Sequence, residues 1–390
     1  MPNAKGKNKG EWSEIYVFFK LLTDRRIYVA DEKMNKLKDA FLDIISIIRE
    51  EKTGFEYRYY TGESVRIKLN GIEVKSVDSC RFAENAALLW GLITSNTSTT
   101  FDSQEIKDFL HSIFVNNITS PPQKKTAYFG GTEDIVLDTR DYRSGVNRIM
   151  GFSCKSDIDA ASTLFNASKD NTNFVYKLTG NMSDQVMDEF NSKFNKVIKN
   201  GKTCYEVAIG KRMTYLKSCG VDMEFVGTAK PISNRNLINC GGLEMPAIVG
   251  GLLKYFYYEQ AASNRKPSID DAVKYITDLD ISGYGFEKPY DIYRSKTINL
   301  LYSMFTGLRF GKVWNGRSDV NGGYIVVKRD GDVVAFHSCI ADEFKNFLYD
   351  KLSFEAPSCK RHDYMRVYKD DSGNYLLKLA LQLRFKLKKR

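Results

Sequence analysis

The strictest pattern in the chain lies near its C-terminus, where apolar and polar residues alternate with a period of two. From Leu377 to Leu387 the odd positions carry leucine or phenylalanine, and most even positions carry lysine, glutamine or arginine. Side chains of a β-strand point alternately to its two faces, so the segment Tyr375 to Leu387 is expected to be a half-buried strand with a basic outer face.

Other segments follow the spacing of amphipathic helices. Asn8 and Glu11 form a capping-box pattern, and the apolar residues between Trp12 and Leu22 then recur every three or four positions. Helical spacing also predicts helices at Met34–Arg49, Ala83–Thr94, Ser103–Phe114, Ser183–Asn200 and Pro246–Ala261. Strands are predicted within Phe55–Val77, Glu133–Ser156 and Gly322–His337. The fold class is therefore mixed α/β.

A change of pattern divides the chain. Residues 1–9 form a basic tail, and residues 10–122 form a mainly helical N-terminal lobe with a small strand region. Ser120-Pro121-Pro122 breaks the helical pattern and marks the boundary to residues 123–390. No low-complexity linker separates the parts, so we expect one compact body with lobes.

The charge balance favours a polyanionic partner. The chain has 58 basic and 48 acidic residues, a formal net charge of +10. Neutralising phosphates releases counterions, so an excess of positive charge suits binding to nucleic acid. A basic soluble protein without such a partner is the alternative.

Cysteine, histidine and apolar content exclude several classes. Seven widely spaced cysteines without a Cys-x-x-Cys pair suit a reducing cytoplasm and disfavour a disulfide framework or a zinc site. Three scattered histidines disfavour a nuclease whose metal is bound by histidine. No segment reaches the roughly 18 apolar residues of a membrane span, and the N-terminus lacks the apolar core of a signal peptide. We expect a soluble, cytoplasmic protein without membrane contact.

The strand pair within Glu133–Ser156 brings an acid close to a lysine. If residues 144–145 form a two-residue turn, Asp134 lies opposite Lys155. Alternation then places four polar residues on one face, namely Asp134, Asp138, Ser153 and Lys155. A carboxylate can hold a divalent metal that polarises a phosphate, and a lysine can orient water and offset negative charge. A surface hairpin with one cross-strand Asp–Lys pair is the simpler interpretation.

A second segment competes for the same interpretation. Glu73-Val74-Lys75 is a literal acid-x-lysine sequence on a predicted strand, but only Glu56 and Glu63 precede it at a suitable distance. Alternating charges on an exposed strand explain it more simply, so we rank it second.

Several blocks of sequence, taken in order, resemble HpaII-type restriction endonucleases. They are Gly10-Glu-Trp-Ser-Glu14-Ile-Tyr-Val-Phe-Phe-Lys-Leu-Leu, Tyr28-Val-Ala-Asp31-Glu32, Gly151-Phe-Ser-Cys-Lys-Ser156, Thr163-Leu-Phe-Asn-Ala-Ser168, Asn171-Thr-Asn-Phe174, Arg361-His-Asp-Tyr364 and Leu377-Lys-Leu-Ala-Leu-Gln-Leu-Arg-Phe385. The resemblance runs nearly end to end, and residues 180 to 320 are less similar. No single block is specific; the ordered set is.

The resemblance implies a bacterial type II restriction enzyme of the PD-(D/E)xK superfamily, with a restriction-endonuclease-like mixed sheet flanked by helices. It implies Mg²⁺-dependent cleavage of double-stranded DNA, and the name-giving member cuts CCGG. Carried over, Lys155 is the catalytic lysine, Asp134 is the metal-binding aspartate, and Ser153 fills the second acid position. Because serine carries no charge, another carboxylate should help, and Glu14 and Asp138 are the candidates. The opening turns of a helix also favour acids such as Glu14 without any function.

Two departures from the family pattern accompany these matches. Cys154 replaces an isoleucine and should face the core, away from Lys155. Asp157-Ile-Asp159-Ala-Ala replaces a glycine-containing turn. This change bears on the position of the helix that follows the site and on the recognition sequence.

Other implied features are coarser. Asn166, Asn173 and Arg361 lie in matching blocks and are the candidates for DNA contacts. A restriction enzyme implies a companion DNA methyltransferase that protects the host, and a palindromic target permits either a homodimer or a monomer that nicks each strand in turn. The alternative function is a DNA-binding protein with a degenerate, inactive nuclease site. A modification enzyme is disfavoured, because a glycine-rich cofactor loop and a Pro-Cys nucleophile motif are both missing.

Overall fold

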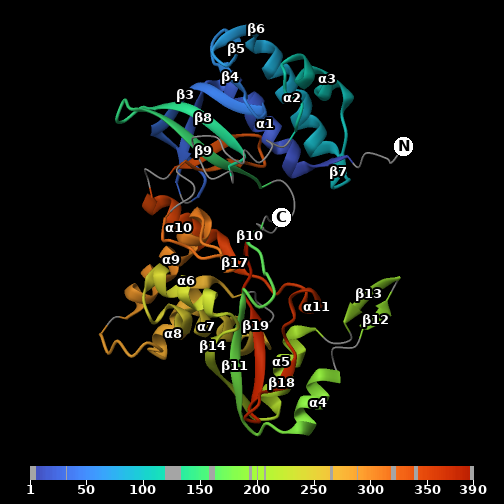
Figure 1. The fold of residues 1–390 in the computed structure, drawn as a ribbon, viewed down its shortest axis with the longest axis vertical. Helices are drawn as coiled ribbons and strands as arrows, with labels where there is room; N and C mark the ends of the chain where they lie inside the picture. The colour runs from blue at the N-terminus through green and yellow to red at the C-terminus, as the bar shows by residue number, and fades with distance from the viewer. Residues whose placement is uncertain are drawn as a thin grey trace. The chain divides into compact units, whose positions relative to one another are not determined.

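The computed structural model groups the chain into two compact units (Figure 1). Unit 1 comprises Met1–Ser162 and Ser318–Phe347, and unit 2 comprises Thr163–Arg317 and Leu348–Lys388. The structure describes residues 6–31, 33–118, 133–157, 163–192, 196–199, 201–205, 208–263, 267–287, 289–317, 322–337 and 341–386. The boundary predicted at Ser120-Pro121-Pro122 lies outside these residues.

Unit 1 is built on a nine-stranded sheet of order β2-β16-β15-β9-β8-β3-β4-β5-β6. The strands are β2 Arg26–Ala30, β16 Val333–His337, β15 Gly323–Val327, β9 Asn147–Ser156, β8 Ile135–Asp141, β3 Lys36–Lys52, β4 Phe55–Tyr60, β5 Ser64–Leu69 and β6 Ile72–Asp78. The pairs β9–β15 and β2–β16 are parallel and the others antiparallel. Since β2 also pairs with β3, the first six strands form a closed circuit.

Helix α1 (Lys9–Asp24) confirms the first predicted helix and its cap. The Asn8 side chain accepts a hydrogen bond from Glu11 N at 2.9 Å, and the Glu11 carboxylate accepts one from Asn8 N at 2.8 Å. Its apolar face is buried with the sheet in one core, which includes Trp12, Phe18, Ile47, Leu137, Phe152 and Ile325. Helices α2 (Ser79–Ser95) and α3 (Gln104–Ser112), both expected from the sequence, complete this core. The short strands β1 (Lys7–Asn8) and β7 (Thr100–Phe101) pair beside it.

The helix predicted at Met34–Arg49 is wrong, because this segment is the long strand β3. The middle of β3 is buried on both faces, with Leu42, Ile44, Ile47 and Ile48 all nearly inaccessible. A strand buried on both faces shows a nearly continuous apolar run that also satisfies helical spacing. Its isoleucines, which are β-branched, favour the strand.

Unit 2 contains an antiparallel sheet of order β14-β11-β19-β18. Its strands are β14 Val221–Thr228, β11 Asn173–Gly180, β19 Tyr375–Ala380 and β18 Val367–Lys369. The helices of the unit are α4 Asp184–Ser192, α5 Ile209–Ser218, α6 Pro231–Gly241, α7 Met245–Lys254 with the π-helical turn Tyr255–Glu259, α8 Ile269–Asp278, α9 Tyr290–Thr306 and α11 Cys359–His362. Tyrosine hydroxyls link this sheet and helices, because Tyr176 donates to Gly250 O and Tyr257 to Ala380 O, at 2.7 and 2.9 Å.

Smaller elements complete the molecule. Strands β10 (Thr163–Phe165), β20 (Leu383–Phe385) and β17 (Leu352–Phe354) form a three-stranded sheet, and β12 (Lys196–Lys199) pairs with β13 (Lys202–Tyr205). Helix α10 spans Ala341–Lys351. The helix predicted at Ser183–Asn200 is confirmed only as α4, which ends at Ser192; Lys196–Lys199 form strand β12 instead. In the described part of the chain, no helix combines the length and apolar character that crossing a bilayer requires.

The predicted C-terminal strand is confirmed in its first half. Leu377 and Leu379 are fully buried in β19, but the chain leaves this sheet after Ala380 and pairs elsewhere as β20. The polar face is not free for a partner. Lys378 forms an ion pair with Asp170 at 2.8 Å, and Arg384 forms one with Glu355 at 2.6 Å.

Candidate active site

The hairpin of β8 and β9 carries the predicted acid and lysine, with a register two positions from the expected one. Ile135 pairs with Phe152 and Asp138 with Ile149, so Asp134 continues opposite Ser153. The predicted two-residue turn is wrong, because four residues (142–145) connect Asp141 to Val146. The Asp141 carboxylate accepts hydrogen bonds from two main-chain N–H groups of this loop and so stabilises it. A shift by two keeps every side chain on its predicted face.

The carboxylate of Asp134 is held by the strand that carries the lysine. Its Oδ2 accepts a hydrogen bond from Cys154 N at 2.7 Å, and the Ser153 side chain also hydrogen-bonds to it. Burial raises the pKa of Asp134, while the charge of Lys155 and these hydrogen bonds lower it. The side chain of Cys154 is buried in the core of unit 1, as predicted.

Glu14 joins this pair from α1. Burial is the main cause that raises its pKa to about 8, and the charge of Asp134 adds to the effect. Lys155 and Arg49 act in the opposite direction. Such mutual effects require the groups to lie close together. Helix α1 and the β8–β9 hairpin therefore bring Glu14, Asp134 and Lys155 into one electrostatic cluster, which we call the acid–lysine cluster.

Lys155 is flanked by an aromatic ring that the sequence did not indicate. Strand β15 runs parallel to β9, with Tyr324 paired with Ser153 and Val326 with Lys155. The Lys155 Nζ lies 5.7 Å from the centroid of the Tyr324 ring, which is within the range of a cation–π interaction. Tyr324 is only 4% exposed, so its ring is a fixed wall beside the ammonium group.

A second residue missed by sequence reasoning is Arg49 on β3, which had been assigned to a helix. Its Nε lies 2.8 Å from the Glu51 carboxylate, and its Nη2 donates to Asn117 O at 2.7 Å. Arg49 is 5% exposed and contributes a positive charge near Glu14. No short sequence motif indicates this role of Arg49, which depends on the pairing of β3 with β8.

The donor set of the acid–lysine cluster fits a magnesium ion better than a transition metal. Among the described residues, no group of three or more histidine, cysteine, aspartate or glutamate side chains is placed to hold a metal. Magnesium, however, is commonly held by one or two carboxylates, with water and substrate phosphate as its other ligands. Glu14 and Asp134 would supply two carboxylates. Burial first and the charge of Asp134 second raise the pKa of Glu14, and a bound cation would offset the repulsion between the two groups.

The other predicted metal candidate lies apart from this cluster. Asp138 pairs with Ile149 on one side and Ser46 on the other. Burial raises the pKa of Asp138, and the charge of Arg58 on β4 lowers it; neither Asp134 nor Lys155 is among the groups that act on it. The structure therefore brings Glu14, and not Asp138, to Asp134 and Lys155.

The competing segment Glu73-Val74-Lys75 has a structural explanation. It lies on β6, where Glu73 is exposed, and Lys75 Nζ donates to Ser112 O at 2.6 Å. Lys75 thus provides a hydrogen bond to a carbonyl at the C-terminal end of α3, where positive charge is favourable.

The three candidates for DNA contacts all lie in unit 2. Asn166 and Arg361 are exposed, whereas Asn173 is fully buried. The Asn173 amide donates to His362 O at 2.9 Å and Asp363 O at 3.2 Å, so it fixes the segment that carries Arg361. In this structure Asn173 positions a loop and cannot reach a base edge.

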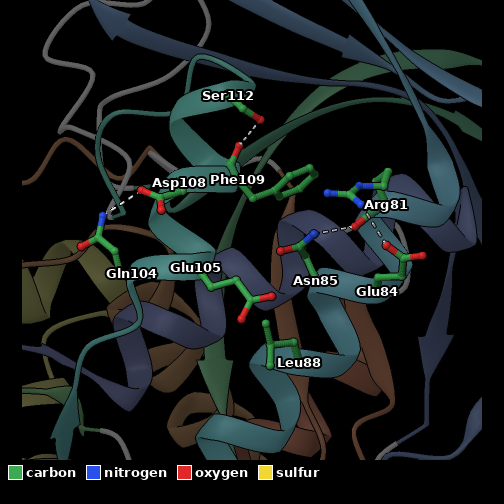
Figure 2. Close-up of a pocket in the computed structure, with 9 residues that line it drawn as sticks. All are labelled: Arg81, Glu84, Asn85, Leu88, Gln104, Glu105, Asp108, Phe109 and Ser112. Atoms are coloured by element: carbon green, nitrogen blue, oxygen red, sulfur yellow. Dashed lines mark hydrogen bonds and ion pairs between the residues drawn. The ribbon is translucent and has the colours of Figure 1, made fainter.

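A hollow of about 670 Å³ between α2 and α3 lies elsewhere in unit 1 (Figure 2). Leu88 and Phe109 contribute apolar surface to it, and Glu84, Glu105 and Asp108 contribute carboxylates. This acidic lining would repel phosphate, so the hollow does not suit a polyanionic substrate.

Comparisons with known proteins identify one family. The sequence model of the HpaII restriction endonuclease family matches residues 8–385. The type II restriction enzyme HpaII of Haemophilus parainfluenzae is 30% identical over 384 residues, which is 97% of this chain and 98% of that protein. No solved structure matches the chain.

Proposed function

This chain belongs to the HpaII restriction endonuclease family, and on this basis we propose that it is a Mg²⁺-dependent type II endonuclease whose active site is the acid–lysine cluster. The observation that carries the proposal is the convergence of Glu14, Asp134 and Lys155 from a helix and a hairpin. The strands around Lys155, flanked by α1, would then be the restriction-endonuclease-like core.

In this proposal Asp134 and Glu14 hold the magnesium ion. The ion would polarise the scissile phosphate and lower the pKa of a bound water. The main-chain N–H of Cys154 orients the Asp134 carboxylate, and the Ser153 side chain supports it. Glu14 supplies the second negative charge that serine in the acid-x-lysine position cannot.

Lys155 would act on the phosphate and on the attacking water. Its ammonium group can offset negative charge that develops on the phosphate oxygens and can donate a hydrogen bond to the water. Its place beside two carboxylates and over the Tyr324 ring leaves it few orientations.

For the target and the cellular setting we extend the similarity to the family. We propose a short palindrome, CCGG or a related sequence, with a companion DNA methyltransferase that protects the host. Cleavage of both strands would be carried out by a homodimer or by a monomer in two steps. A DNA-binding protein with an inactive site is the alternative, because serine occupies one acid position.

The test is digestion of a sequenced plasmid by purified protein, with Mg²⁺ or with EDTA. We expect discrete Mg²⁺-dependent fragments that disappear in Lys155→Ala and persist in Lys75→Ala, the matched lysine of the competing segment. Uncut plasmid together with tight, salt-sensitive binding would support the binding-protein alternative. Cutting that survives Lys155→Ala and is lost in Lys75→Ala would move the site to Glu73 and Lys75.

A further inference from the structure

Three loops of unit 2 that lie far apart in the sequence converge beside Asn173. Residues 168–173 lead into β11, residues 228–230 follow β14, and residues 361–363 end α11. Ala229 N donates to Asn173 O at 2.8 Å, and the Asn173 side chain holds the carbonyls of His362 and Asp363. Lys169 N donates to His362 Nδ1 at 3.4 Å. Asn173 thus joins all three loops, through its buried side-chain amide and its main-chain carbonyl.

Each of these loops presents an exposed cation. Lys169, Lys230 and Arg361 are exposed, and none of them forms an ion pair with a carboxylate of the described residues. We call these three residues the basic triad. The cations of β19 and β20 differ from the triad, because they are neutralised by Asp170 and Glu355.

Electrostatic effects place the triad in one neighbourhood. Burial lowers the pKa of His362, and the charges of Arg361 and Lys169 lower it further. Asp170 feels the charge of Lys230 as well as that of its partner Lys378. The other nearby carboxylate, Asp363, acts on Lys378 and Tyr368. Lys169 and Arg361 therefore lie close to His362, and Lys230 lies close to Asp170, a carboxylate that is already paired with Lys378. The positive charge of the triad is left for an external anion.

Two residues in these loops have a backbone conformation that is rare outside glycine. Lys169 and Asp363 both have positive φ, at 46° and 50°, although neither is glycine. Non-glycine residues persist in this region only where their surroundings fix them, and such positions concentrate at binding sites. The turn at Lys169 and the cap of α11 are therefore held in the shape that brings these cations together.

We propose that the basic triad contacts the phosphate backbone of duplex DNA and positions the duplex without reading its bases. The inference rests on the proposed function, since it takes DNA as the substrate. Long cationic side chains on turns suit phosphate contacts, whereas base reading needs groups that enter a groove in a fixed geometry. This changes the role of Arg361 from a candidate base-reading residue to a positioning residue.

The test is binding of a 30-base-pair duplex of random sequence by the full chain in EDTA, measured by fluorescence anisotropy over a range of salt concentrations. Each phosphate contact contributes about 0.9 to the slope of log affinity against log salt. We expect Lys169→Ala, Lys230→Ala and Arg361→Ala each to reduce the slope by about 1, and the triple variant to reduce it by about 3. Lys211→Ala on α5, also an exposed lysine without an ion pair, is the matched control and should leave the slope unchanged.

Two further results separate the possible failures. If the wild type cuts DNA while the triad variants bind like Lys211→Ala, the proposed function stands and this inference is overturned. If the wild type neither binds nor cuts DNA, both are overturned. Arg361→Lys separates a phosphate contact from a base contact. Because lysine keeps the positive charge, a phosphate contact should survive, and binding to random and target duplexes should be preserved alike. A selective loss on the target duplex would make Arg361 a base-reading residue and overturn its assignment to phosphate.

Discussion

Asp134 and Cys154 are joined by a hydrogen bond of 2.7 Å from the Cys154 main-chain N–H to the Asp134 Oδ2. Cys154 stands between Ser153 and Lys155, so the strand that supplies the lysine also orients the aspartate. The distance between acid and lysine is thus set by strand pairing, and only the side-chain conformations remain to be fixed.

This relationship predicts that Asp134→Asn removes activity without removing structure. An asparagine Oδ1 can still accept the hydrogen bond from Cys154 N, but the side chain no longer carries the charge that holds a metal. A metal ion supplies several kcal/mol of transition-state stabilisation, so cleavage should fall by about 10³-fold or more. The measurement is single-turnover cleavage of a plasmid at saturating enzyme.

Binding of the same DNA provides the control for Asp134→Asn. Without Mg²⁺, affinity should stay equal or increase, because a buried negative charge close to the phosphate has been removed. Cleavage within tenfold of the wild type would contradict a role of Asp134 in holding the metal.

Glu14 and Glu11 lie three residues apart on α1 and should respond differently to the same substitution. Glu14→Gln removes a carboxylate of the acid–lysine cluster, so we expect slower cleavage and a higher Mg²⁺ concentration for half-maximal rate. Glu11→Gln changes the capping box and the ion pair with Lys7, both outside the acid–lysine cluster, so it should cost at most the roughly 0.5–2 kcal/mol of a lost cap and activity should remain. The measurements are Mg²⁺ titrations of the rate and urea unfolding of both variants. An unchanged Mg²⁺ requirement in Glu14→Gln would contradict a role of Glu14 in holding the metal.

The raised pKa of Glu14 also predicts how stability depends on pH. Its pKa is about 8 in the folded protein, against an ordinary value of 4.5. Between these values the folded state holds the proton more tightly than the unfolded state, so stability falls as pH rises through this window. Asp134, whose pKa is also raised, contributes in the same direction.

The measurement is the melting temperature in EDTA at pH 6 and pH 8. Wild type should melt at a higher temperature at pH 6, and Glu14→Gln should lose part of this difference, because glutamine does not titrate. Mg²⁺ at pH 8 should stabilise the wild type more than the variant. An equal pH difference in both proteins would contradict the burial of Glu14 beside Asp134.

Sequence reasoning placed Asp134 and Lys155 side by side but missed residues around them. Lys155 and Asp134 could be placed on one face because alternation along a strand is insensitive to a register error of two. The parallel pairing of β15 with β9 joins residues about 170 positions apart, and no local pattern encodes it. For the same reason Tyr324 could not be found from its own strand.

The segment Lys36–Lys52 shows where sequence patterns fail. Burial on both faces produced apolar spacing that also fits a helix, and the true environment became clear only through its pairing with β2, β4 and β8. Asn173 shows the opposite failure. An asparagine in a block that resembles the family is a reasonable candidate for DNA contact. In the structure, however, the side chain is completely buried and donates its hydrogen bonds to main-chain carbonyls.

The contact between Lys155 and Tyr324 yields the last prediction. Tyr324→Leu keeps a buried apolar side chain but removes the aromatic face under the ammonium group. A cation–π interaction is worth about 0.5–2 kcal/mol, so kcat should fall about 2- to 30-fold, while KM changes little because the ring is buried. Tyr324→Phe keeps the ring and should keep the rate.

A purely structural role for Tyr324 would lower stability without altering the catalytic lysine. The cleavage rate of the fully folded protein distinguishes the two roles, since only loss of the ring removes the contact with the Lys155 ammonium group. We expect Tyr324→Leu to cleave slowly even at temperatures well below its melting temperature, and Tyr324→Phe to cleave at the wild-type rate. If Tyr324→Leu loses stability but cleaves like the wild type where it is folded, the ring supports the sheet rather than the lysine.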